Sequence, residues 1–165
     1  MRSMENNLLK ELTALQQMMS GSQREFYDAM LKDARCVTCT PLKELFTPRE
    51  IALIRSSIRP QKKECYRNAH LMALYFSDVE YVEGKVQLDC GLGIEHAFNR
   101  RGDRYFDITW ELVLHNSVED VPYLSIGEYS ATQINEIAVK NGYYGDIFRH
   151  LYIKNNINNH GKESH

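Results

Sequence analysis

The sequence predicts a single α+β domain, because two hydrophobic periodicities occupy different parts of the chain. Apolar residues recur every three or four positions over much of the chain up to Phe76, as they do on one face of a helix. After this point, short segments rich in β-branched and aromatic residues are separated by turn residues, as in an antiparallel sheet. Helices first and a meandering sheet afterwards are typical of the α+β class.

Four helices are expected before the sheet. Apolar spacing predicts an amphipathic helix over 4–19 and a second helix over 22–34. We expect these two to form a hairpin that packs on the body of the protein or makes a dimer contact. The third helix is the best marked, since Thr47 suits its N-cap and Pro48 its first position. The fourth begins at Cys65 and ends near Phe76.

The strand pattern covers 80–88, 94–99 and 104–110, and Arg101-Gly102-Asp103 marks a hairpin turn between the last two segments. A further helix is expected over 130–140, closed by Asn141-Gly142. The resulting organisation is one domain followed by a flexible tail, with the boundaries 1–59 (helical part), 60–112 (core), 113–154 (C-terminal part) and 155–165 (tail).

Composition excludes several classes of protein. The chain has 165 residues, of which 43% are hydrophobic and 25% charged, and its formal net charge is −2. This balance favours neither nucleic acid nor an anionic membrane as a partner. No signal-peptide pattern and no run of 18 apolar residues is present, so we expect a cytoplasmic protein. Four cysteines are too few for a disulfide scaffold of this length, which favours reduced thiols.

Cys65 is the strongest candidate for a nucleophile, because it is expected at the first position of a helix. A cysteine attacks only as thiolate, and the unpaired N–H groups and dipole of a helix N-terminus favour negative charge. The same N–H groups can hold the oxyanion that forms when a thiolate attacks a carbonyl.

His96 and Asp107 are the candidates for a base and its partner. A hairpin turn centred on Arg101-Gly102 would place them directly opposite each other on adjacent strands, with their side chains on one face. His96 would then use Nδ1 to bind the Asp107 carboxylate and turn Nε2 toward Cys65. A three-residue loop would change this register by one residue and weaken the pairing.

Three segments resemble the core of the papain-like superfamily. They are most similar to the branch that holds transglutaminase-like proteins, NlpC-type peptidases and arylamine N-acetyltransferases, in which a cysteine opens a helix and histidine and aspartate lie on adjacent strands. The segments are Glu64-Cys65-Tyr66-Arg67-Asn68-Ala69, Ile94-Glu95-His96-Ala97-Phe98-Asn99 and Tyr105-Phe106-Asp107-Ile108-Thr109. The resemblance covers about residues 60–112 and implies Cys65, His96 and Asp107 as nucleophile, base and orienting carboxylate. It also suggests Gln61 as a weak candidate for an oxyanion donor.

The chemistry that these residues imply is attack of a thiolate on an amide of a protein or peptide substrate, as in a peptidase, a glutamine deamidase or a transglutaminase, without a cofactor. An alternative of a different class is a binding module or inhibitor with the same fold and no turnover, in which the N-terminal helix contacts the partner. Replacement of Cys65 by alanine distinguishes the two.

A zinc site is the remaining rival. Cys36 and Cys39 form a C-x-x-C pair, but a structural zinc ion needs two further ligands at recognisable spacing, and the sequence has no second such pair. Cys65 and His70 would point about 140° apart around a helix. We therefore expect no metal ligands in this chain.

Overall fold

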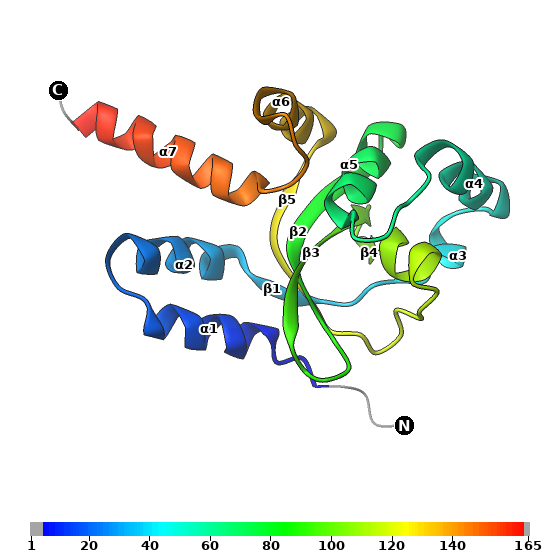
Figure 1. Ribbon diagram of the computed structural model, residues 1–165, viewed down its shortest axis with the longest axis horizontal. Helices are drawn as coiled ribbons and strands as arrows, with labels where there is room; N and C mark the ends of the chain where they lie inside the picture. Colours follow the sequence, from blue (N-terminus) through cyan, green and yellow to red (C-terminus); the bar gives the residue numbers. More distant parts are fainter. Residues whose placement is uncertain (1–4, 164–165) are drawn as a thin grey trace.

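The computed structural model describes residues 5–163 and has the mixed α+β architecture that the sequence predicts (Figure 1). Its helices are α1 Leu8–Met18, α2 Gly21–Asp33, α3 Leu42–Leu45, α4 Pro48–Leu53, α5 Cys65–Tyr75, α6 Ala131–Asn141 and α7 Ile147–Glu163, with two π-helical turns, η1 Ile54–Ile58 and η2 Thr109–Val113. Its strands are β1 Arg35–Val37, β2 Val79–Gln87, β3 Gly93–Arg101, β4 Arg104–Phe106 and β5 Tyr123–Tyr129.

The five strands form one antiparallel sheet in the order β1-β5-β2-β3-β4. The sheet curls, since the chain just after β1 reaches the opposite edge strand. There Cys39 makes an isolated bridge with Tyr105 of β4, and the N–H of Thr40 donates to the carbonyl oxygen of Tyr105 at 2.7 Å. The strands β1 and β5 come from outside residues 60–112, so the sheet needs both parts of the chain that flank the expected core.

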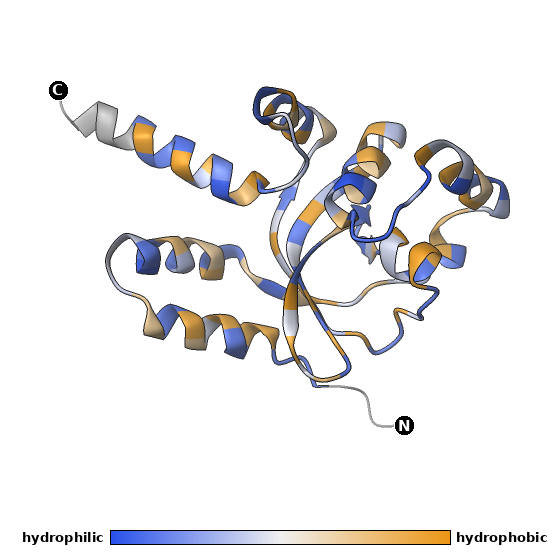
Figure 2. Cartoon of the chain, in the orientation of Figure 1, coloured by the Kyte–Doolittle hydropathy of each residue, from blue (hydrophilic) through white to orange (hydrophobic). Residues whose placement is uncertain are grey.

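Helices cover this sheet from two sides. Helix α5 packs along β2 and β3, whereas the α1–α2 hairpin and α7 extend from the other side of the sheet (Figure 1). Figure 2 shows hydrophobic and hydrophilic residues alternating along α1, α2 and α7, as amphipathic helices require. None of the helices within residues 5–163 has the length and apolar composition needed to cross a bilayer.

Inside the curl lies an aromatic and aliphatic cluster with Phe98 and Tyr123 at its centre. A second cluster joins α5 to the helices before it through Met72 and Phe106, and a third joins α5 to α6 through Ala69 and Ile134. Helix α5 therefore contacts core residues along its length, which fixes the position of its first residue.

Helix α4 starts as predicted. The Thr47 hydroxyl accepts from the N–H of Glu50 at 3.1 Å, the Glu50 carboxylate accepts from the N–H of Thr47 at 2.9 Å, and Pro48 follows the cap. Helix α1 is shorter than predicted, because the side chain of Asn6 accepts from the N–H of Leu8 at 3.1 Å and the helix begins there. Met4, the first residue of the predicted helix, lies outside the described residues.

Three predictions about the second half were incomplete or wrong. The strand expected over 104–110 ends at Phe106, because the Asp107 side chain accepts from the N–H of Trp110 at 3.1 Å and begins a helical turn. A helix after residue 141 was not predicted, and α7 runs from Ile147 to Glu163. Strands β1 and β5 were not predicted, because β1 has three residues and β5 contains a glycine and lacks the alternating pattern of a half-buried strand.

Gly84 has a specific role in the sheet. It lies where the β2–β5 register shifts, and a Cβ atom there would overlap the carbonyl oxygen of Leu124. We expect Gly84→Ala to lower the free energy of unfolding by about 2–4 kcal/mol, because the backbone of two buried strands must move apart. Urea unfolding followed by circular dichroism measures the change, with Lys85→Ala at the next position as control. A loss below about 0.5 kcal/mol would contradict the close approach.

Candidate active site

Cys65 is the first residue of α5, as predicted, and its side chain is half-buried. The preceding residue, Glu64, makes no capping hydrogen bond with its side chain. Because the first N–H groups of a helix have no partner within the helix, those beside the Cys65 thiol remain available for an anionic atom.

The loop before Cys65 is held by two polar side chains of the same helix. Asn68 is fully buried, its Oδ1 accepts from the N–H of Gln61 at 3.0 Å, and its Nδ2 donates to the carbonyl oxygen of Gln61 at 2.9 Å and to Thr109 Oγ1 at 3.0 Å. The Arg67 guanidinium donates to the carbonyl oxygens of Ile58 and Arg59 at 3.0 and 3.1 Å. These bonds tie the start of α5 to the segment that follows Asp107.

His96 and Asp107 are buried and hydrogen-bonded to each other. The distance from His96 Nε2 to Asp107 Oδ2 is 2.7 Å. The predicted pair is therefore present, but the predicted ring orientation was wrong, because Nε2 and not Nδ1 faces the carboxylate. This leaves Nδ1 as the nitrogen free to face Cys65.

The predicted strand register was also wrong. The hairpin turns on Gly102-Asp103, with Gly102 at a φ of 63°, and Asn99 faces Phe106. This register is two residues away from the one predicted, so Asp107 lies diagonally across from His96 and just beyond the end of β4. Because side chains on a strand alternate with a period of two, this shift leaves both residues on the same face.

Asp107 has two further donors that hold its carboxylate in place. The Tyr123 hydroxyl donates to Oδ2 at 2.8 Å, and the N–H of Trp110 donates to Oδ1 at 3.1 Å. Tyr123 is fully buried and packs in the same core cluster as Cys39. Sequence reasoning missed Tyr123, because its strand β5 was not predicted and no local pattern marks it.

The environment of His96 favours its charged form. Burial lowers the pKa of the imidazole, but the charge of Asp107, its hydrogen bond and the hydrogen bond and charge of Cys65 together outweigh burial and raise the pKa to about 10. The influence of Cys65 on the pKa of His96 means that the predicted nucleophile lies near the His96–Asp107 pair. An imidazolium in this position can stabilise a thiolate and later donate a proton.

Gln61 is exposed, and the hydrogen bonds found for it among residues 5–163 use its backbone and not its side chain. The structure therefore does not join the Gln61 amide to Cys65, His96 and Asp107.

The four cysteines are all free thiols. Cys36 is exposed on β1, whereas Cys39 is buried, and burial raises the pKa of the Cys39 thiol well above its ordinary value. Within residues 5–163 no group of three or more His, Cys, Asp or Glu side chains is arranged to hold a metal ion.

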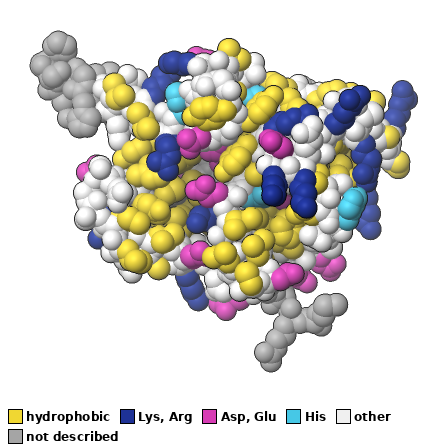
Figure 3. Space-filling view, viewed as in Figure 1, with side chains coloured by type: hydrophobic (Ala, Val, Ile, Leu, Met, Phe, Trp, Pro, Cys, Tyr) yellow, Lys and Arg dark blue, Asp and Glu magenta, His cyan; other side chains and the backbone are white. Residues whose placement is uncertain are grey.

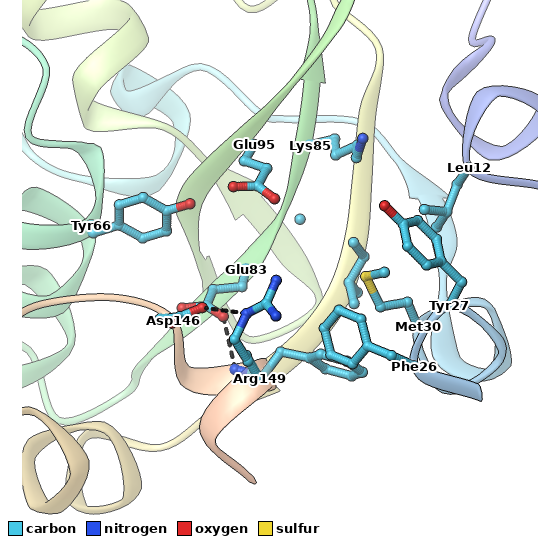
Figure 4. Close-up of a pocket in the computed structure, with 13 residues that line it drawn as sticks. Leu12, Phe26, Tyr27, Met30, Tyr66, Glu83, Lys85, Glu95, Asp146 and Arg149 are labelled. Atoms are coloured by element: carbon cyan, nitrogen blue, oxygen red, sulfur yellow. Dashed lines mark hydrogen bonds and ion pairs between the residues drawn. The ribbon is translucent and has the colours of Figure 1, made fainter. Parts of the chain in front are cut away.

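A pocket of about 100 Å³ is lined by sequence neighbours of Cys65 and His96, although Cys65, His96 and Asp107 do not themselves line it. Its lining includes Tyr66, which follows Cys65 in the chain, Glu95, which precedes His96, and Gly84, which pairs with His96 across the strands. The far wall comes from α1, α2 and the start of α7 (Figure 4). Sequence reasoning missed this pocket, because its walls come from distant parts of the chain.

A scan against protein-family models, a search of curated proteins and a search of solved structures each found no match to this chain. Its function is therefore argued from the geometry of its own residues.

Proposed function

We propose that this protein is a cysteine-dependent amide hydrolase or acyl transferase that uses Cys65, His96 and Asp107 as nucleophile, base and orienting carboxylate. The observation that supports the proposal is the position of His96, which is hydrogen-bonded to Asp107 at 2.7 Å and lies close enough to the thiol at the start of α5 for Cys65 to contribute to its raised pKa. The order of the three residues, and their positions at a helix start, on a strand and just after the next strand, favour a relationship with the papain-like superfamily.

The proposed reaction begins with attack of the Cys65 thiolate on the carbonyl carbon of an amide. The carbonyl oxygen becomes an oxyanion, which the N–H groups at the start of α5 can stabilise. As the C–N bond breaks, His96 gives its proton to the departing amine, and a thioester remains on Cys65.

A second nucleophile then attacks the thioester. His96 removes a proton from that nucleophile, the S–C bond breaks, and Cys65 returns to its thiolate form. With water as nucleophile the reaction is peptide hydrolysis or glutamine deamidation, and with an amine it is transamidation. Peptide hydrolysis and glutamine deamidation differ in the amide that enters the site. Transamidation differs from both in the nucleophile that attacks the thioester.

The rate of thiol alkylation tests the proposal. Cys36 and Cys90 are exposed and Cys65 is half-buried, so accessibility alone predicts that Cys65 reacts more slowly with iodoacetamide. We expect the opposite order at neutral pH, with Cys65 alkylated about tenfold faster, because His96 stabilises its thiolate. Mass spectrometry of peptides from timed samples measures all the rates in one protein, and His96→Asn should remove the advantage. Equal rates at Cys65 and Cys36 would overturn the assignment of the nucleophile.

A further inference from the structure

The pocket beside Cys65 has two chemically different sides. Figure 4 shows Tyr66, Glu83, Glu95 and Asp146 on one side and apolar side chains on the other, with Lys85 and Arg149 between them. Figure 3 shows the same division at the surface, where acidic side chains border a hydrophobic area over α1, α2 and α7. The apolar residues are Leu12, Phe26, Tyr27, Met30, Ile126 and Phe148.

The acidic side is the one next to the candidate nucleophile. Burial is the largest cause of the raised pKa of Tyr66, and the charges of Glu95, Cys65, Glu83 and Asp146 raise it further. Tyr66, Glu83, Glu95 and Asp146 all line this pocket. A ligand group that reaches the Cys65 thiol from this side of the pocket passes these carboxyl groups.

Most of the charged side chains in the pocket already have partners. The Glu83 carboxylate is buried and accepts from the Tyr81 hydroxyl at 2.6 Å and from the N–H groups of Ile147 and Phe148 at 3.0 and 2.9 Å. Arg149 contacts Asp146 at 3.4 Å, and its guanidinium lies 4.7 Å from the centre of the Phe26 ring. These groups are fixed by the fold rather than free for a ligand.

Glu95 is different. Its side chain is exposed, and no ion pair involving it is found within residues 5–163. Lys85 pairs with Glu95 across the strands, but its ammonium group points toward the α1–α2 side in Figure 4. Glu95 is thus the carboxylate in the pocket lining that remains available to a positive charge from outside.

We propose that the pocket binds the N-terminal residue of a peptide substrate, with the α-ammonium group at Glu95 and an apolar side chain against Phe26 and Met30. This inference rests on the proposed function and names its substrate class. An N-terminal residue fits the two sides of the pocket, because its charge lies one carbon from the carbonyl under attack and its side chain points away. A lysine side chain that entered the pocket would instead place its apolar stem at the carboxylate side and its ammonium group at the apolar side.

The test uses leucine chloromethyl ketone with a free amine and its N-acetylated form, near pH 6.5, where an α-amino group is protonated (ordinary pKa about 8). Each alkylation rate at Cys65 is divided by the rate of the same reagent with N-acetylcysteine, which removes the intrinsic effect of the ammonium group on the ketone. We expect the free-amine reagent to be about fivefold faster after this correction, which is the upper end of what an exposed ion pair contributes. Glu95→Gln should abolish the preference, and Glu136→Gln, which removes an exposed carboxylate on α6 outside the pocket lining, should keep it.

The proposed contact of an apolar side chain with Phe26 and Met30 is tested with alanine chloromethyl ketone, which also has a free amine. We expect it to react several-fold more slowly than the leucine reagent, because it leaves the wall formed by Phe26 and Met30 uncovered. Equal corrected rates for the free and acetylated forms, or a preference that survives Glu95→Gln, would overturn the inference. The proposed function would stand in that case, provided that iodoacetamide still selects Cys65 over Cys36 and Cys90, and it fails separately if that selection is absent.

Discussion

Replacement of Cys65 by alanine is expected to lower acyl transfer by about 10³-fold or more, because the thioester cannot form without the sulfur. The measurement needs no knowledge of the natural substrate. With p-nitrophenyl acetate the wild-type protein should release a burst of p-nitrophenol stoichiometric with the protein, and intact mass spectrometry should show one acetyl group on Cys65. The alanine variant should show neither.

Two matched variants make this result specific. Cys36→Ala and Cys90→Ala each remove an exposed thiol, and both should keep the full burst. A burst that persists in Cys65→Ala would show that another group is acylated, and the enzyme proposal would fail. If a biological effect of the protein is found and survives this substitution undiminished, the chain acts by binding a partner rather than by turnover.

The sequence predicted the class of the fold and the three residues of the candidate site for a physical reason. Cys65 follows a polar stretch and precedes a helical apolar pattern, and this local signal places it at a helix start. His96 and Asp107 lie on the two sides of one short turn, so their proximity is also a local property. Only the exact register of β3 and β4 depended on the turn. The predicted register was wrong by two residues, which leaves the His96 and Asp107 side chains on the same face of the sheet.

The parts that were not predicted depend on contacts between distant segments. Tyr123 reaches Asp107 because β5 joins the sheet beside β2, and no pattern near residue 123 indicates that pairing. The ring orientation of His96 likewise depends on where Asp107 lies after β4 has ended. The pocket combines α2, α7 and the sheet, so it exists only in the assembled fold.

Asp107→Asn is expected to lower turnover by about 10²–10⁴-fold and to make His96 easier to deprotonate. The carboxylate charge is one of the main causes that raise the pKa of His96 to about 10, and the amide of asparagine has no charge to replace it. NMR titration of the His96 ring protons should give a midpoint near 10 in the wild type and a lower midpoint in the variant. An unchanged midpoint would contradict the role of Asp107.

The same pair has a consequence for stability whose sign follows from the direction of the shift. The pKa of His96 is higher in the folded state than the ordinary value of 6.5, so the pair stabilises the fold fully below that pH and loses this contribution as the pH rises through about 10. Urea unfolding should therefore show the wild type losing stability over this range relative to Asp107→Asn.

Tyr123→Phe provides the comparison that separates charge from hydrogen bonding. It removes one of the two donors to Asp107 Oδ2 and leaves the carboxylate charge in place. Turnover should therefore fall by only about tenfold, the size expected for one hydrogen bond to a charged group. The His96 midpoint should stay well above that of Asp107→Asn, because the charge that raises it remains. If both variants lowered the midpoint equally, the geometry of the carboxylate rather than its charge would control the imidazole.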